Sequence, residues 1–433
     1  MNNLKQILMN MGLSWTTLIE SLILLLFFII FKFWFAFLVF LAFCGFLAYK
    51  IWMLLRQMKK QNRDDIFNQS LPKSMRAAYY STSWSRTIDF NEYLLPAISK
   101  GDELLIKVHS ASLNPVDYKI NFNRIPFYRW FLFPNLGIGK DFSGEVVQVG
   151  DMISKYRIGD NVYGFSKYGC FQEYTIAKES WVHPIPDRVK FEQAASVPLV
   201  GCTTYQALIY FYKNINNNDN IYTEYGYEPD LSGKNVLVIG ASGGCGHVGI
   251  QIAKFLNANE VYGVCSHDNV NIIKNIGVCE DVFAYDSENF EKVLDTVLYT
   301  EDGQPKIDLI LDTVSSREDG DVGKMYMRYL KEDGYYVALN SSSIFQFSTG
   351  LIRSLIPKIN LEKKGSHVHF LNRDDSSKGL DVLSNMMSQG KITFLTNKVE
   401  FDYQAIEEAI KMLKSRRTRG KLVCNIIEEN NLL

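Results

Sequence analysis

Residues 236–249 constrain the fold more than any other stretch of this 433-residue chain. The apolar run 236–239 has the length and character of a buried parallel strand. Glycines follow at Gly240, Gly243 and Gly246, and apolar residues then recur at helical spacing. A strand, a glycine turn and a helix place free N–H groups and the positive end of a helix dipole where a pyrophosphate would bind. The stretch therefore predicts a dinucleotide-binding fold, and the alternative is a glycine-rich turn without a ligand.

Length, charge and cysteine content set broader limits. The chain is long enough for two or three domains with their own cores. Its formal net charge of −1 argues against nucleic acid as the main partner. The seven cysteines are scattered, odd in number and without a CxxC pair. This pattern indicates a reducing compartment, with neither a disulfide framework nor a cysteine-based zinc site.

One segment near the N-terminus is much more apolar than the rest. Residues 22–48 are almost entirely apolar, and Lys32 is the main interruption. About 20 apolar residues in a helix span a bilayer core of about 30 Å, so this run predicts a transmembrane helix. Lys32 leaves a tilted or longer helix and a short hairpin open, but no Gly, Pro or Asn turn lies beside it, which favours a single span.

The charges around this segment indicate its orientation. Before it stands Lys5, offset by Glu20. After it come five basic residues: Lys50, Arg56, Lys59, Lys60 and Arg63. Because basic flanks stay on the cytosolic side, we expect the large C-terminal part to face the cytosol, on the endoplasmic reticulum or the mitochondrial outer membrane.

The hydrophobic period changes along the chain. We expect five segments: 1–50 with the span, a linker over 51–74, a β-rich domain over 75–200, alternating strands and helices over 201–345, and a return to the first domain over 346–433. In the alternating segment the pattern predicts strands at 235–239, 261–265, 282–285, 307–312 and 335–339, and helices at 248–257 and 286–299. A further helix is expected at about 403–415, and a surface insertion at 213–233. The fold class is therefore α/β, with a doubly wound parallel sheet.

Five short stretches carry a family resemblance. They are residues 110–117 (SASLNPVD), 139–147 (GKDFSGEVV), 159–164 (GDNVYG), 194–198 with 203–208 (AASVP and TTYQAL), and 420–423 (GKLV). Together with the glycine turn, they resemble the medium-chain dehydrogenase/reductase superfamily. Within it they are similar to the zinc-free quinone oxidoreductase branch, close to the reticulon-interacting mitochondrial proteins. The resemblance implies a GroES-like β domain joined to a Rossmann domain, a cleft between the two, and frequent pairing as homodimers.

The resemblance also bears on zinc. Alcohol dehydrogenases of the superfamily place zinc ligands where this chain has Asn114-Pro115 and Lys140-Asp141. A zinc site needs three or four converging N, S or O ligands. His367 and His369 form a close pair, but two ligands without a third are more typical of surface histidines. We therefore expect no metal.

The end of the second Rossmann strand indicates the cofactor. Enzymes that use NAD carry an acid there to bind the ribose 2′-OH, whereas this chain has Ser266. His267 and Lys274 lie nearby and favour a 2′-phosphate, while Asp268 opposes it. Tyr285 falls where NADPH-binding members of the family place a phosphate-contacting tyrosine, although packing on the sheet is an alternative role. We expect NADPH, bound by Thr203, Gly240, Ser242, Gly243, Gly244, Cys245, Gly246, Ser266 and Tyr285.

Without a metal, the remaining chemistry is hydride transfer to an activated acceptor such as a quinone or an enone. Asn114 is the best candidate for a polar group near the nicotinamide, and capping of the Asn-Pro turn is equally consistent with its position. Asp117 and Lys119 lie on the same loop and either relay a proton or form an ion pair. Thr203 either contacts the nicotinamide or caps a helix.

These observations lead to a membrane-anchored, zinc-independent NADPH oxidoreductase that acts on a quinone or an α,β-unsaturated carbonyl, with a lipophilic acceptor drawn from the bilayer as one option. The alternative is a non-catalytic membrane adaptor on a reductase scaffold, since fold alone does not establish function. A weaker third hypothesis is a redox sensor whose NADPH occupancy changes partner binding. Binding of NADPH discriminates the first hypothesis from the second.

Overall fold

The computed structural model describes residues 40, 43–52, 71–80, 88–119, 137–216, 230–314, 322–339, 366–368 and 376–427. The chain forms two compact units, residues 1–71 and 72–433. In the first unit, residues 43–52 are helical. No helix among the described residues is long and apolar enough to cross a membrane. The span expected at 22–48 lies mostly outside the described residues, which include only 40 and 43–48 of it.

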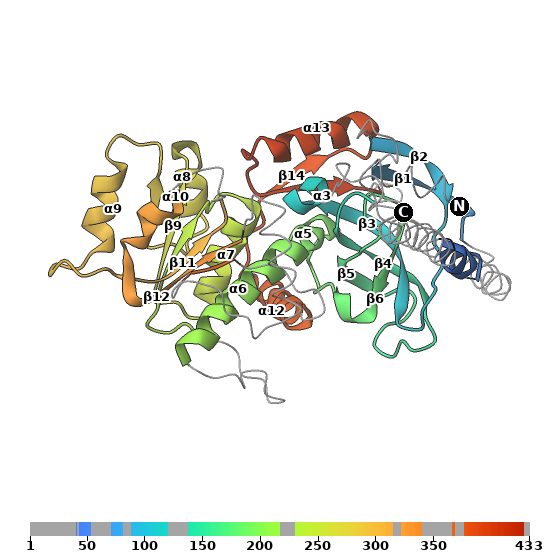
Figure 1. The fold of residues 1–433 in the computed structure, drawn as a ribbon, viewed down its shortest axis with the longest axis horizontal. Coiled ribbons are helices and arrows are strands. Elements are labelled where there is room, and N and C mark those ends of the chain that lie inside the picture. The colour runs from blue at the N-terminus through green and yellow to red at the C-terminus, as the bar shows by residue number, and fades with distance from the viewer. Residues whose placement is uncertain are drawn as a thin grey trace, which may run out of the picture. The chain divides into compact units, whose positions relative to one another are not determined.

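A parallel sheet forms one half of the second unit (Figure 1). Within the described residues it has six strands in the order β10-β9-β8-β11-β12-β13. Every neighbouring pair is parallel, which confirms the expected doubly wound sheet. The strands are β8 (Asn235–Ile239), β9 (Glu260–Cys265), β10 (Asp281–Ala284), β11 (Ile307–Asp312), β12 (Leu330–Ala338) and β13 (Ser366–Val368).

Strand β8 is buried along its whole length because helices cover both faces of the sheet. Val236 and Val238 belong to the same core as the apolar residues of α7 (Gly244–Phe255) and α6 (Pro198–Asn216). The alternate residues Leu237 and Ile239 pack on the opposite face. In its described residues this half also contains α8 (Val270–Lys274), α9 (Phe290–Leu298) and α10 (Val322–Met327).

Two predicted helices differ from the structure at their starts. The helix expected at 248–257 is α7, which begins at Gly244 because glycines of the turn already adopt helical geometry, although they carry no hydrophobic period. The helix expected at 286–299 is α9, which begins at Phe290. Residues before it form a turn in which the Ser287 N–H donates to the Ala284 carbonyl at 3.2 Å.

The other half of the second unit is rich in β-structure and confirms the expected GroES-like architecture. In its described residues a seven-stranded sheet follows the order β14-β15-β3-β4-β5-β7, and β6 also pairs with β3. The strands are β3 (Glu103–Leu113), β4 (Asp141–Val149), β5 (Asn161–Phe165), β6 (Tyr174–Lys178), β7 (Val182–Pro184), β14 (Thr396–Val399) and β15 (Lys421–Asn425). β1 (Ser74–Tyr80) and β2 (Ile88–Leu94) form a separate antiparallel pair.

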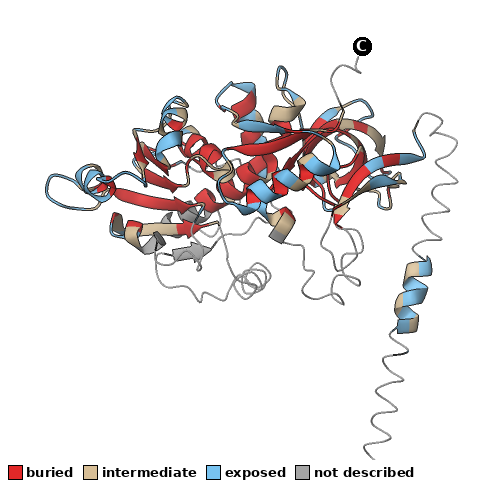
Figure 2. Cartoon of the chain, turned by 90° about the horizontal axis from the view of Figure 1, so that it is seen from above, coloured by how far each residue is buried: buried red, intermediate tan, exposed pale blue. Residues whose placement is uncertain are grey.

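Helix α13 (Tyr403–Lys414) covers part of this β-rich half and matches the helix expected at 403–415. Asp402 caps its N-terminus, since the Asp402 carboxylate accepts the Ala405 N–H at 2.9 Å, and the last turn carries Lys411 and Lys414. Its buried residues recur at helical spacing and join the core of the β-rich half: Ile406, Ala409, Ile410 and Leu413. Figure 2 shows buried residues concentrated in the strands and on the helix faces toward them.

Helices α6 and α12 (Ser377–Ser388) connect the two sheets (Figure 1). α6 contacts β5 of the β-rich half and β12 of the parallel sheet, and α12 contacts both α6 and β7. Short α3 (Pro115–Lys119) and α5 (Phe191–Ala195) lie on the β-rich side. The start of α6, the end of β3 and the glycine turn of α7 therefore meet in one region.

Candidate functional site

The glycine turn after β8 has the backbone that its spacing predicts. Gly240 has a φ of +79°, and a Cβ there would lie 2.3 Å from Val314 Cγ2. At Gly246 a Cβ would lie 2.0 Å from the Gly240 carbonyl oxygen. Both positions therefore require glycine, the first for its conformation and the second because α7 packs directly on the turn.

The N-terminus of α7 is open to an anion. Gly243 caps the helix in an extended conformation, without a side-chain hydrogen bond, and the first turn carries no acid. A Cβ at Gly243 would meet only the Gly240 carbonyl oxygen, at 3.4 Å. The turn thus combines backbone donors, the positive end of a 12-residue helix and little steric cover, which fits a pyrophosphate. Ser242, Gly244 and Cys245 belong to the same turn.

A polar cluster lies at the end of β9, beside this turn. The Asn269 Nδ2 donates to Ser266 Oγ at 2.8 Å and to Ser242 Oγ at 3.3 Å. Among the described residues no group donates to the buried Asn269 Oδ1. The structure therefore brings Ser242 and Ser266 together through Asn269, a residue that was not among the predicted site residues.

The other residues expected near the cofactor phosphate lie at the surface. Tyr285 is 57% exposed, so it does not pack on the sheet as its alternative role required, and its N–H donates to the Cys265 carbonyl at 3.0 Å. The ammonium of Lys274 forms an ion pair with Asp281 at 3.0 Å. Its charge is thus partly compensated, which weakens the expected contribution of Lys274 to phosphate binding.

Asn114, Asp141 and Lys421 form a buried network at the end of β3. Asn114 Nδ2 donates to Asp141 Oδ2 at 2.8 Å, and Lys421 Nζ donates to Asn114 Oδ1. Lys421 Nζ also donates to the Leu113 carbonyl at 2.9 Å and lies 3.4 Å from Asp141 Oδ2. The three residues are at most 2% exposed. Such a network is stable only because nearly every polar group in it has a partner.

Asp141 joins further elements to this network. Its Oδ2 accepts from Ser112 Oγ at 3.0 Å, and its Oδ1 accepts the Leu199 N–H at 3.0 Å, at the start of α6. Burial raises the pKa of Asp141, while the Lys421 ammonium and the hydrogen bonds lower it. Asp141 and Lys421 were not predicted as site residues, although both stand in stretches that carry the family resemblance.

Asp117 and Thr203 have local roles in the structure. Asp117 Oδ2 accepts the Asn114 N–H at 2.7 Å, and Asp117 Oδ1 is buried without a partner among the described residues. Burial raises the pKa of Asp117 to about 7, against the lowering effect of Lys140.

Thr203 lies inside α6 and donates to the Leu199 carbonyl at 2.6 Å, so the expected helix-capping role is wrong. The side chain of Lys119 lies outside the described residues, so neither of its expected roles can be placed.

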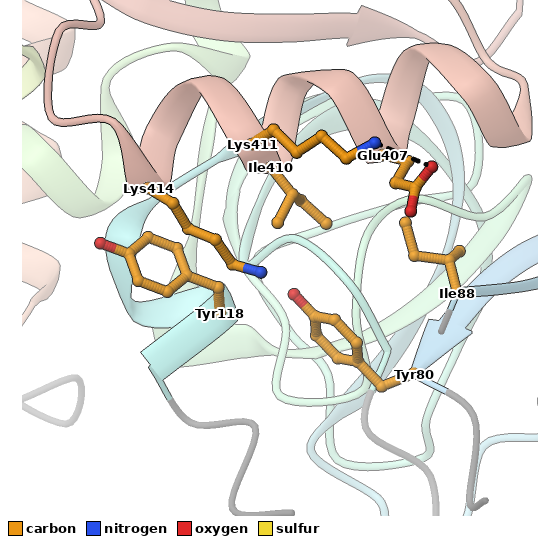
Figure 3. A pocket seen from close by; sticks show the side chains of 7 residues that line it. All are labelled: Tyr80, Ile88, Tyr118, Glu407, Ile410, Lys411 and Lys414. Carbon is orange, nitrogen blue, oxygen red and sulfur yellow. Dashed lines mark ion pairs between the residues drawn. The ribbon is translucent and has the colours of Figure 1, made fainter. Parts of the chain in front are cut away.

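A separate cavity of about 270 Å³ lies between α13, α3 and the β1–β2 pair (Figure 3). Its lining residues are Tyr80, Ile88, Tyr118, Glu407, Ile410, Lys411 and Lys414. Lys411 pairs with Glu407 at 3.3 Å. None of the lining residues belongs to the glycine turn or to the Asn114 network, so this cavity is not the place where a cofactor would meet a substrate.

Two family matches agree with this architecture. Residues 100–187 match the Alcohol dehydrogenase GroES-like domain, and residues 279–424 match the family described as Zinc-binding dehydrogenase. Fold, glycine turn and these matches define the class: the chain is an oxidoreductase of the medium-chain dehydrogenase/reductase superfamily. No three His, Cys, Asp or Glu side chains gather as a metal site in the described part of the chain.

More particular likenesses fall within this class. The chain is 28% identical over 360 residues to NAD(P)H oxidoreductase RTN4IP1, mitochondrial, of Bos taurus, covering 77% of this chain and 84% of that protein. It is 28% identical over 386 residues to trans-enoyl reductase pgmF of Aspergillus terreus, covering 83% and 98%. The solved quinone oxidoreductase of Coxiella burnetii matches with a TM-score of 0.61 and 26% identity, covering 82% of this chain and 99% of the other.

Proposed function

We propose that this oxidoreductase uses NADPH to reduce a quinone or an α,β-unsaturated carbonyl without zinc. The observation that supports this most is the contact between the buried Asn114 network and the glycine turn. A Cβ at Gly244 would lie 3.1 Å from Lys421 Cδ, so the side chain that holds Asn114 passes beside the start of α7. The relatives named trans-enoyl reductase and quinone oxidoreductase support the two proposed classes of acceptor.

The nicotinamide cofactor, when bound, supplies the hydride. The chain's own residues orient the reactants, exclude water and stabilise the charge that develops on the acceptor oxygen. Asn114 Nδ2 has a second N–H beyond the one used by Asp141, which suits it to donate to that oxygen. The network consists of an amide, an ammonium and one carboxylate. This donor set does not suit zinc, which binds imidazole, thiolate and carboxylate groups in threes or fours.

The preference for NADPH rests on the second Rossmann strand. Ser266 follows β9 where an NAD-specific enzyme carries an acid, so no carboxylate at that position repels a 2′-phosphate. His267 is exposed on the same turn. Its backbone N–H is already engaged, because it donates to Asp286 Oδ1 at 2.8 Å. Ser266 and the Ser242 hydroxyl therefore carry the proposed preference.

The apolar segment 22–48 supports attachment of the enzyme to a membrane, with the reductase facing the cytosol and a lipophilic acceptor drawn from the bilayer. The mitochondrial relatives favour the mitochondrial outer membrane over the endoplasmic reticulum.

The decisive experiment uses the full chain purified in detergent. NADPH and NADH are titrated by cofactor fluorescence, and quinones and enones are then screened for oxidation of the bound cofactor. Tight NADPH binding with turnover of either acceptor class supports the proposal. Absence of binding to both cofactors contradicts it and favours the adaptor hypothesis.

A further inference from the structure

Lys421 stands between the two parts of the proposed active site. Its ammonium has three N–H groups and three acceptors: the Leu113 carbonyl, Asn114 Oδ1 and Asp141 Oδ2. It therefore has no proton to donate to a substrate without breaking a buried bond. A residue held in this way acts by fixing its neighbours.

The neighbour most affected is the amide of Asn114. An Asn side chain can present its oxygen or its nitrogen in either direction, and its hydrogen-bond partners decide which. Lys421 can only donate, so it takes Oδ1 of Asn114, and the Asp141 carboxylate can only accept, so it takes Nδ2. Together, Lys421 and Asp141 allow only one orientation of the Asn114 amide, so the second N–H of Nδ2 always points in the same direction.

The residue before Lys421 contacts the cofactor turn. The N–H of Gly420 donates to the Ser242 carbonyl at 2.9 Å, and Gly420 forms a parallel bridge with Gly243. Gly420 has a φ of +60°, and a Cβ there would lie 2.0 Å from the Leu395 carbonyl oxygen, so this position requires glycine. Two consecutive residues therefore join the glycine turn to the Asn114 network.

We propose that Lys421 is the positioning residue of this active site: it sets the amide orientation of Asn114 and, through Gly420, couples that amide to the cofactor turn. The inference deepens the proposed function and rests on it. Asn114 is the group that would touch the substrate, and Lys421 acts through it.

A double variant separates positioning from stability. Lys421→Met alone leaves the Asp141 carboxylate buried without its cation, and loss of folding would explain any loss of activity. Adding Asp141→Asn removes that charge. The amide introduced at position 141 keeps an acceptor toward the Leu199 N–H and presents its NH₂ to Asn114. The Asn114 amide then flips, so that its oxygen faces position 141. Lys391→Met, a change at an exposed lysine of the same C-terminal part, is the matched control.

We expect the double variant to recover the wild-type Tm to within about 3 °C and to bind NADPH within about threefold of wild type, while kcat falls at least about tenfold. The KM for the acceptor should change less than kcat, and the control should match wild type in all four quantities. Recovery of kcat together with Tm would show that Lys421 only stabilises the fold, and would overturn the inference.

Amide hydrogen exchange tests the coupling without any turnover. Exchange in residues 240–247 of the cofactor-free double variant should be at least about threefold faster than in wild type, although Tm is recovered. Unchanged exchange overturns the coupling. If wild type reduces no acceptor, the proposed function fails, and this second measurement still decides whether Lys421 holds the turn.

Discussion

Gly420 donates its backbone N–H to the carbonyl of Ser242 at 2.9 Å, so the segment that leads into β15 is bonded directly to the glycine turn. The turn is therefore supported on one side by its own helix and on the other by the β-rich half. A cofactor that binds there contacts a backbone held by both halves of the second unit. We expect binding to stiffen their connection and to raise Tm.

The glycine turn offers a matched pair of substitutions. Gly246→Ala places a Cβ 2.0 Å from the Gly240 carbonyl oxygen and should lower the free energy of unfolding by about 1–3 kcal/mol. Gly243→Ala meets only a 3.4 Å contact and should lower the free energy of unfolding by less than about 1 kcal/mol. It should nevertheless weaken NADPH binding at least about tenfold, because the added methyl group would lie where the anion approaches the turn. Denaturant unfolding and cofactor fluorescence check both. Wild-type affinity in Gly243→Ala would contradict the placement of the pyrophosphate.

Ser266 is expected to control the choice of cofactor. Ser266→Asp places a carboxylate where a 2′-phosphate would lie and should raise the Kd for NADPH about tenfold or more, while NADH binding stays the same or improves. Thr296→Asp on exposed α9 adds the same charge as a control and should change neither Kd. Equal losses for both cofactors would show that Ser266 is not near the ribose.

Asp117 should make stability depend on pH. Its pKa in the folded protein is raised to about 7, above the value near 3.8 expected in the unfolded chain. The fold therefore favours the protonated form, and this contribution is complete below about pH 4 and is lost as pH rises toward 7. As the pH rises from about 4 to 7, the free energy of unfolding of Asp117→Asn should gain up to about 4 kcal/mol relative to that of wild type. Denaturant unfolding of both proteins across that range measures the difference, and a constant difference would refute it.

The first 71 residues should be dispensable for folding of the reductase, because the chain forms two compact units that divide at residue 71. Removal of residues 1–71 should change the Tm and the NADPH affinity of the remainder by less than experimental error. It should also release the protein from the membrane fraction of cells, as judged by carbonate extraction. A full-length protein that carbonate extracts would refute the span expected at 22–48.

Much of the fold could be predicted from the sequence because it depends on local signals. The strand, turn and helix of 236–249 are written in adjacent residues, and β8 and β9 lie where their apolar runs predicted them. Strand β12 starts at Leu330, earlier than the predicted 335. The prediction missed its first half because exposed polar residues such as Glu332 and Asp333 interrupt the apolar run there.

The Asn114 network could not be predicted in the same way. Asn114 was selected from its loop, but its partners lie 27 and 307 positions away, at Asp141 and Lys421. Only the packing of β3 between β4 and β15 brings these three side chains together. Likewise, Asn269 carries no local signal beyond its position three residues after Ser266.

The pairing of β15 with β3 also sets an order of events during synthesis. Leu422 lies opposite Leu113, so a central strand of the β-rich half waits for a neighbour that the ribosome makes long after it. The parallel sheet can form before that point, but the β-rich half cannot close until β15 has been made. A nonsense codon just before Lys421 would therefore leave residues 110–113 of β3 without their partner strand, as an open edge on which another chain could pair.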